Sequence, residues 1–186
     1  MIVSLDQAVQ QLRQGNVIAY PTEAVWGLGC NPYNQTATEQ LLNSKQRQLD
    51  KGLILVAANM QQAMPFLSTL SNDQLHAIEL SWLEAPDERA TTWLVPLSIQ
   101  VPAWISGGHD RVALRVSHHP VVQELCLRFD GVIVSTSANP SGQPAARTEQ
   151  EVLHYFPDIS LVQGDTQQHS QPSKIVDAIT GAVIRP

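Results

Sequence analysis

Residues 19–30 read AYPTEAVWGLGC. The apolar run 17–19, just before Pro21, is typical of a buried strand. After the proline, Thr22 either braces a turn or meets a ligand, and Glu23 is an acceptor for a substrate amine, a metal ion or a neighbouring arginine. Because ligands of open α/β sheets bind in the loops at the carboxyl ends of strands, this stretch predicts both a sheet and the position of a site.

Strands and helices alternate on both sides of this stretch. Capping-box patterns predict helices that begin after Ser4, Ser71 and Thr148. Helices are expected at 5–14, 35–45, 72–83 and 119–129 and after Thr148, and strands at 17–20, 52–57, 91–97, 111–116, 131–136, 159–163, 174–178 and 182–185. This alternation predicts an α/β fold in which helices pack on a sheet.

Length and composition predict one folded domain, spanning residues 1–186. Hydrophobic residues make up 43% of the chain and charged residues 15%, as in a protein with a packed core. No repeat or linker divides the sequence, and no apolar run approaches the ~20 residues of a membrane span. Neither of the two cysteines lies in a CxxC pair, so we expect a protein of the reducing cytoplasm, without a membrane.

Charge and missing motifs exclude several function classes. The net charge of −6 argues against general coating of RNA or DNA, although a local basic patch remains compatible with it. The sequence lacks the Cys/His spacing of a zinc site, so no protein-bound metal is expected. It also lacks the Walker-type loop GxxxxGK[ST], so any use of ATP must rely on another phosphate site.

Two polar segments next to predicted strands carry candidate ligand contacts. The segment 44–52, SKQRQLDKG, places Lys45, Arg47 and Lys51 between a helix end and a buried strand. Each cation alone would fit a helix C-terminal dipole, but three within seven residues favour a polyphosphate site. The segment 134–148, VSTSANPSGQPAART, offers hydroxyl, amide and main-chain donors for phosphate, or is simply a polar turn.

Five stretches together resemble the YrdC-like threonylcarbamoyl-AMP synthase family. They are YPTEAVWGLGC, SKQRQLDKGLILVA, ALRVSHHP, VIVSTSANPSGQPAART and PSKIVD…GAVIRP, in the family's order and spacing from about residue 5 onward. The resemblance implies a single-domain, twisted and mostly open α/β sheet with flanking helices and a concave, positively charged cavity. The length is similar to that of the short bacterial form.

The family's reaction is then expected of this chain. It joins L-threonine, bicarbonate and ATP, with Mg²⁺ on the phosphates, into threonylcarbamoyl-adenylate and releases pyrophosphate. Other proteins, the downstream tRNA threonylcarbamoyl-transferases, place the threonylcarbamoyl group on adenosine 37 of tRNAs that read codons beginning with A. The chemistry needs no protein nucleophile, because positioning and charge suffice.

The resemblance also implies roles for individual residues. Lys45 and Arg47 match the KxR pair that holds the ATP phosphates, and are the expected catalytic cations. The residues implied to contact threonine are Thr22, with the nearby glycines allowing close approach, Arg115, Ser135 and Ser173. The further residues implied to contact the nucleotide are Thr92, Ser137, Asn139, Arg147 and Arg185.

One segment departs from the family pattern. Where the family has Pro-Gly-Pro before a threonine, this chain reads WLEAPDERATTWLVP, so either Thr91 or Thr92 takes that place, and Thr92 aligns better. Because of this departure, another possibility is that the chain is a family member that binds nucleotide but has lost turnover. An RNA-binding or ribosome-maturation factor that uses the same cavity, with weak RNA binding, is the alternative from another class.

Overall fold

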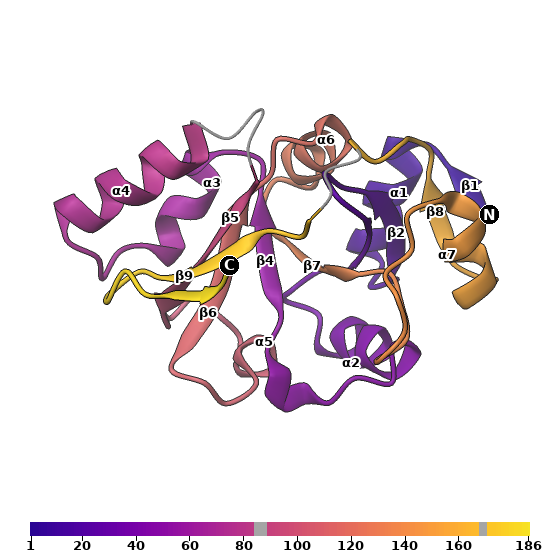
Figure 1. The fold of residues 1–186 in the computed structure, drawn as a ribbon. Helices are drawn as coiled ribbons and strands as arrows, with labels where there is room; N and C mark the ends of the chain where they lie inside the picture. The colour runs from indigo at the N-terminus through magenta and orange to yellow at the C-terminus, as the bar shows by residue number, and fades with distance from the viewer. Residues whose placement is uncertain (84–88, 168–170) are drawn as a thin grey trace.

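The computed structural model describes residues 1–83, 89–167 and 171–186, and its centre is one mixed sheet. In these residues the strands follow the order β1-β8-β2-β3-β7-β4-β6-β5-β9-β10 across the sheet (Figure 1). The strands are β1 (Ile2–Val3), β2 (Ile18–Pro21), β3 (Trp26–Gly29), β4 (Ile54–Ala57), β5 (Thr91–Pro96), β6 (Arg111–Val116), β7 (Ile133–Ser137), β8 (Ser160–Val162), β9 (Lys174–Asp177) and β10 (Val183–Arg185). The sheet contains parallel pairs such as β4–β6 and antiparallel pairs such as β4–β7, so the expected open α/β sheet is confirmed and is mixed in direction.

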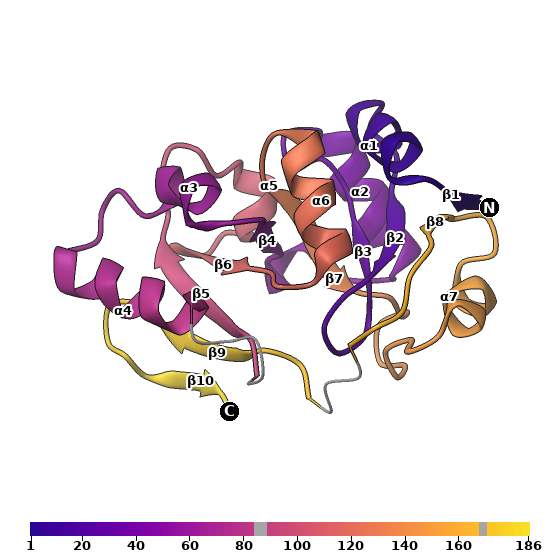
Figure 2. The ribbon, with the colours of Figure 1, turned by 90° about the horizontal axis from the view of Figure 1, so that it is seen from above.

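Helices flank this sheet on both faces. They are α1 (Leu5–Arg13), α2 (Gln35–Ser44), α3 (Met60–Ala63), α4 (Asn72–Leu83), α5 (Ala103–Ser106), α6 (Pro120–Phe129) and α7 (Glu149–Tyr155), with 3₁₀ turns η1 (Leu49–Lys51) and η2 (Met64–Phe66). Seen from above, α1 and α6 lie side by side over the sheet (Figure 2). The capping boxes predicted at Ser4 and Thr148 are both formed, which explains why these helix starts could be read from the sequence.

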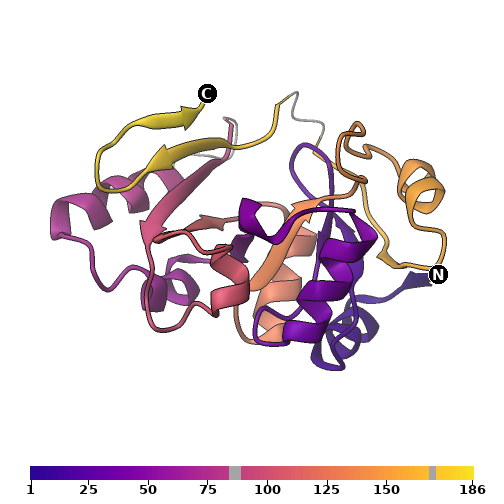
Figure 3. The same ribbon diagram turned by 90° about the horizontal axis from the view of Figure 1, so that it is seen from below.

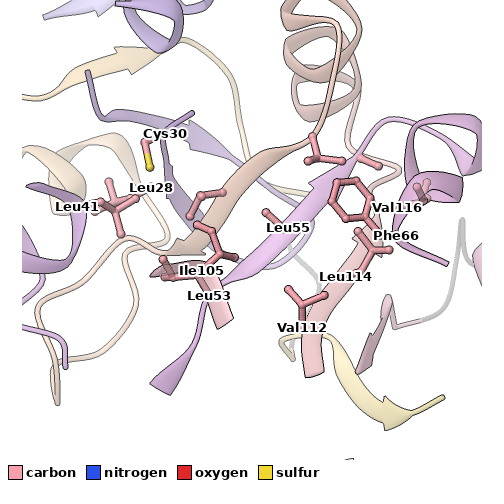
Figure 4. Close-up of a cluster of buried hydrophobic side chains, with 14 of the residues drawn as sticks. Leu28, Cys30, Leu41, Leu53, Leu55, Phe66, Ile105, Val112, Leu114 and Val116 are labelled. Carbon is pink, nitrogen blue, oxygen red and sulfur yellow. The ribbon is translucent and has the colours of Figure 1, made fainter. Parts of the chain in front are cut away.

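Strand alternation separates the buried residues into two cores. Ile18 and Tyr20 pack with α1 and α6, whereas Ala19 between them belongs to the core on the opposite face. Figure 4 shows part of this second core, in which Leu41 of α2 and Ile105 of α5 lie near strand residues. Because successive strand side chains point to opposite faces, an apolar strand fills both cores.

The glycines of the opening stretch lie in a strand, which corrects the expectation of a loop. Trp26–Gly29 forms β3, antiparallel to both β2 and β7. A Cβ on Gly29 would stand 2.4 Å from the Val134 carbonyl oxygen and 2.8 Å from the Tyr20 ring. The absence of a side chain at Gly29 therefore leaves room for the Tyr20 ring, whose hydroxyl donates to Val134 O. Close packing inside the sheet, and not close approach of a substrate, explains this glycine.

Candidate active site

A cavity of about 830 Å³ opens where several loops and strand ends meet. Its walls come from five separated stretches of chain: 22–27, 47–54, 105–115, 135–147 and 171–185, joined by Ala90 and Leu94. In Figure 3 the yellow β9–β10 hairpin lies apart from the indigo β2–β3 turn, and residues of both line this cavity. Segments from the whole length of the chain therefore meet in one basin.

Thr22 closes the tight turn between β2 and β3. Its main-chain N–H and its Oγ1 donate to the Val25 carbonyl oxygen at 3.1 and 2.6 Å. The bracing role left open by the sequence is thus observed. Thr22 also lines the cavity, so the β2–β3 turn forms part of its wall.

Glu23 is paired with an arginine, the third of the partners considered for it. Its Oε2 lies 3.1 Å from Nη1 of Arg115, and both side chains are less than a tenth exposed. Its Oε1 accepts from Ser117 Oγ at 2.6 Å and from the His118 N–H at 3.1 Å. Burial alone would raise the pKa of Glu23, but the Arg115 charge and these hydrogen bonds outweigh it and lower the pKa to about 2.

Lys45 is buried at the end of α2, behind the cavity wall. Its ammonium donates to the carbonyl oxygens of Ser137 and Asn139, the latter at 2.7 Å, and to Asn139 Oδ1 at 3.4 Å. The hydrogen bonds described for its ammonium thus go to the loop after β7. Burial, assisted by the charge of Arg47, lowers the pKa of Lys45 to about 8.

Arg47 turns to a different place from Lys45, although one residue separates them. Gln46 adopts a left-handed φ of 52°, and the N–H groups of Gln46 and Arg47 bond to Asn43 O and Leu42 O. This is the Schellman ending of α2, which reverses the chain after Lys45. Arg47 then donates to the carbonyls of Lys51 and Gly52 at 3.3 and 3.0 Å and lines the cavity.

The loop after β7 is held by internal hydrogen bonds. Asn139 Nδ2 donates to the carbonyls of Pro140 and Gln143 at 3.0 and 2.6 Å. The serines Ser135 and Ser137 line the cavity beside Arg147, whose main-chain N–H donates to Glu151 Oε2 at 2.6 Å. The loop is therefore an ordered wall whose shape Asn139 maintains.

On the opposite wall, a hydrogen-bonded series connects β5, the segment before β9, and β10. Thr92 Oγ1 lies 2.8 Å from Ser173 Oγ, and Arg185 donates to the Ser173 carbonyl at 3.1 and 2.6 Å. Thr92 is fully buried, while Ser173 and Arg185 line the cavity. Thr92 therefore acts on the wall through Ser173. Of the segment 82–96, which departs from the family pattern, residues 84–88 lie outside the described residues.

Most of the predicted site residues come together. The cavity is lined by Thr22, Arg47, Arg115, Ser135, Ser137, Arg147, Ser173 and Arg185. The three others, Lys45, Thr92 and Asn139, are not among its described lining residues. Lys45 and Thr92 each bond to a lining serine, and Asn139 accepts from Lys45. The structure thus separates a layer that faces the cavity from a layer that supports it.

Arg111 and Asp177 are lining residues that the sequence reading did not single out. Arg111 Nε donates to Asp177 Oδ2 at 2.7 Å, which lowers the pKa of Asp177 to about 2. A signal was present, because Arg111 and Arg115 are four residues apart on β6 and so face the same side of the sheet.

Cations outnumber acids in the described cavity wall. The cations are Arg47, Lys51, Arg111, Arg115, Arg147 and Arg185, against Glu23, Asp110 and Asp177. Such a lining suits an anionic ligand in a chain whose net charge is −6. Among the described residues no group of three or more His, Cys, Asp and Glu side chains could hold a metal ion, and each helix is too short or too polar to cross a bilayer.

Comparison with known proteins identifies the family of this chain. The model of the Sua5/YciO/YrdC family, described as "Telomere recombination", matches residues 10–186. A threonylcarbamoyl-AMP synthase of Acinetobacter baumannii is 48% identical over 185 residues, which cover 98% of each chain.

Two solved structures share the fold. P. abyssi Sua5 complexed with L-threonine superposes with a TM-score of 0.85 at 26% identity, covering 95% of this chain and 54% of the other. This chain thus spans about half the length of that protein. E. coli YciO has a TM-score of 0.80 at 20% identity, covering 97% and 87% of the two chains. The fold, the matched residues and the 48% identity together show that the chain belongs to the Sua5/YciO/YrdC family.

Proposed function

We propose that this chain is a threonylcarbamoyl-AMP synthase, which joins L-threonine, bicarbonate and ATP and releases pyrophosphate. The observation that carries the proposal is the convergence of Arg47, Arg115, Arg147 and Arg185 on one cavity. The names of relatives such as the A. baumannii enzyme, and the L-threonine in the P. abyssi structure, support it.

The reaction has two bond-forming steps. The amine of threonine takes up bicarbonate, with loss of water, to give a carbamate. A carbamate oxygen then attacks the α-phosphorus of ATP, and the bond to the departing pyrophosphate breaks. Both steps bring anions together, and two unit charges 4 Å apart repel by about 4 kcal/mol at an effective dielectric constant of ~20. Cations already fixed in the cavity offset this repulsion.

In our proposal the lining residues divide between a threonine site and a nucleotide site, each drawing on both walls of the cavity. Arg115 binds the threonine carboxylate, with Thr22, Ser135 and Ser173 completing the threonine site. On the nucleotide side, Arg47, Arg147, Arg185 and Ser137 contact ATP. The support is that each of these residues lines the same cavity.

The remaining three residues act from behind the wall. Lys45 and Asn139 fix the loop that carries Ser137, and Thr92 fixes Ser173. For the Lys45 ammonium to meet a phosphate, as the KxR pair implies, it would exchange one carbonyl partner for a phosphate oxygen. Lys45 and Arg47 are thus the cations proposed for the departing pyrophosphate.

Magnesium enters the proposal only as the ion carried by ATP. Among the described residues no group of three or more His, Cys, Asp and Glu side chains could hold a metal ion, and we derive no step through a protein-held Mg²⁺. We further propose that the product passes to the downstream tRNA threonylcarbamoyl-transferase proteins in the cytoplasm.

One incubation tests the activity. The protein is mixed with threonine, bicarbonate, Mg²⁺ and ATP, pyrophosphate release is followed, and the adenylate is identified by mass spectrometry. We expect both products to need all three substrates. ATP hydrolysis that ignores threonine would contradict the proposal. Nucleotide binding without turnover would favour an inactive relative, and salt-sensitive RNA retention on filters without turnover would favour the RNA-binding alternative.

A further inference from the structure

Glu23 occupies a buried position between the β2–β3 turn and the start of α6. Its side chain is about 5% exposed, and its Oε1 accepts two hydrogen bonds, from Ser117 Oγ and the His118 N–H. Ser117 is fully buried; its N–H donates to Ala57 O, and its Oγ accepts from the His119 N–H. One carboxylate oxygen is therefore held by the fold itself.

The other oxygen faces Arg115 in an unusual way. Oε2 lies 3.1 Å from Nη1, yet within the described residues it has no aligned hydrogen-bond donor. A guanidinium has five N–H donors and commonly grips a carboxylate with two of them. Here Glu23 touches one nitrogen through charge, and Arg115 still lines the cavity. With five N–H donors and the described Glu23 contact made through Nη1, the guanidinium has donors to spare for a second carboxylate.

We infer that Glu23 is a positioning residue for the amino-acid substrate, because it fixes the Arg115 guanidinium with its forked donors turned toward the cavity. This inference rests on the proposed function, in which Arg115 binds the threonine carboxylate. Without the Glu23 charge, the long Arg115 side chain would retain its charge but lose its fixed orientation. The loss of this orientation should raise the KM for threonine and leave the KM for ATP nearly unchanged.

The chain offers a matched control on the opposite wall. Asp177 is also a buried carboxylate that lines the cavity and holds an arginine, Arg111, at 2.7 Å. It too accepts two main-chain N–H bonds, from Ile179 and Thr180. Asp177→Asn therefore reproduces the loss of a buried carboxylate charge without touching Arg115.

The experiment measures the KM for threonine and for ATP separately. We expect Glu23→Gln to raise the threonine KM about tenfold or more, since Arg115 loses the partner that orients it, and to leave the ATP KM within about twofold. Glu23→Asp should recover part of the loss. Asp177→Asn should raise the threonine KM far less than Glu23→Gln does, because Arg115 keeps its partner.

A double variant tests whether Glu23 acts through Arg115. If it does, Glu23→Gln adds nothing to the threonine KM of Arg115→Met, because the group it orients is gone. Additive effects, or equal threonine defects in Glu23→Gln and Asp177→Asn, would overturn the inference. So would a Glu23→Gln enzyme with an unchanged threonine KM, and Glu23→Asp provides the same comparison if the Gln variant does not fold. Wild-type protein without threonine-dependent turnover would instead refute the proposed function.

Discussion

The ammonium of Lys45 connects the end of α2 to the loop after β7, through the carbonyl oxygens of Ser137 and Asn139. The two elements are more than ninety residues apart in the chain. Ser137 lines the cavity and Lys45 does not, so this contact sets the position of a wall from outside it. A buried cation and the hydrogen bonds of Asn139 within the loop therefore hold this wall together.

Lys45→Met tests this dependence. The variant keeps most of the side-chain volume but leaves the loop carbonyls without their donor, so we expect turnover to fall at least about tenfold and the unfolding free energy to drop by roughly 1–3 kcal/mol. Pyrophosphate release and denaturant unfolding measure the two effects. A loss of turnover with unchanged stability would instead mean that the ammonium serves the phosphates directly.

The depressed pKa of Lys45 predicts a pH effect on activity. Because burial lowers this pKa to about 8, the ammonium loses its charge in the native protein above that pH, and turnover should fall. An arginine stays charged over this range, so Lys45→Arg, if it turns over at all, should lack this decline.

The lowered pKa of Lys45 predicts the opposite trend for stability, which should increase with pH where turnover falls. Between about pH 8 and the ordinary lysine pKa of ~10.4, the native chain binds fewer protons than the unfolded chain, so this group makes folding more favourable as pH rises. A fall in turnover that tracked unfolding across this window would contradict the assignment.

Arg47 should behave differently from Lys45, because it is only partly buried and faces the cavity. We expect Arg47→Ala to lower turnover and raise the ATP KM while the melting temperature changes little, and Arg47→Lys to recover only part of the activity, since lysine lacks the planar fork. Steady-state kinetics and thermal unfolding provide the readout.

Arg128 provides the matched control for that experiment. It is an α6 residue paired with Asp6 and Glu124, and it does not line the cavity in the described structure. Arg128→Ala should keep the wild-type kinetics. An equal kinetic defect in both variants would assign the effect of Arg47 to general charge and not to the site.

Gly29 gives a prediction about the fold alone. An alanine there would place its Cβ 2.4 Å from Val134 O and 2.8 Å from the Tyr20 ring, in contact with β7 and β2. We expect Gly29→Ala to destabilise the protein by roughly 1–3 kcal/mol or more, as overpacking does. The melting temperature is the measurement.

Gly131 provides the comparison in this case. A Cβ there meets only the Phe129 ring, at 4.0 Å, so Gly131→Ala should be neutral or slightly stabilising. If the two alanine variants melted together, the packing explanation for Gly29 would be wrong.

Local signals made the longer helices predictable, but not the short α3 and α5. The Ser4 and Thr148 capping boxes are formed by residues three apart, so a short stretch contains the whole motif. Strand β3 could not be read in this way, because two of its four residues are glycines and one partner, β7, begins more than a hundred residues later. Such a strand exists because of tertiary packing, which overrides weak local propensity.

The candidate site was only partly predictable, because its geometry also depends on tertiary packing. The motifs named the residues, but spacing could not show that Lys45 and Arg47 turn to different partners. That difference arises from the left-handed backbone of Gln46, a conformation that a glutamine seldom signals in advance. Likewise, Glu23 left three partners open until β6 placed Arg115 beside it.

The walls of the cavity come from five stretches spread between Thr22 and Arg185, so no single stretch of the chain forms the site. No excised fragment retains it, and partial opening of any one stretch removes part of it. A ligand that spans the cavity consequently binds only the complete native state. By mass action, bound ligand then raises the free energy of unfolding of the whole chain.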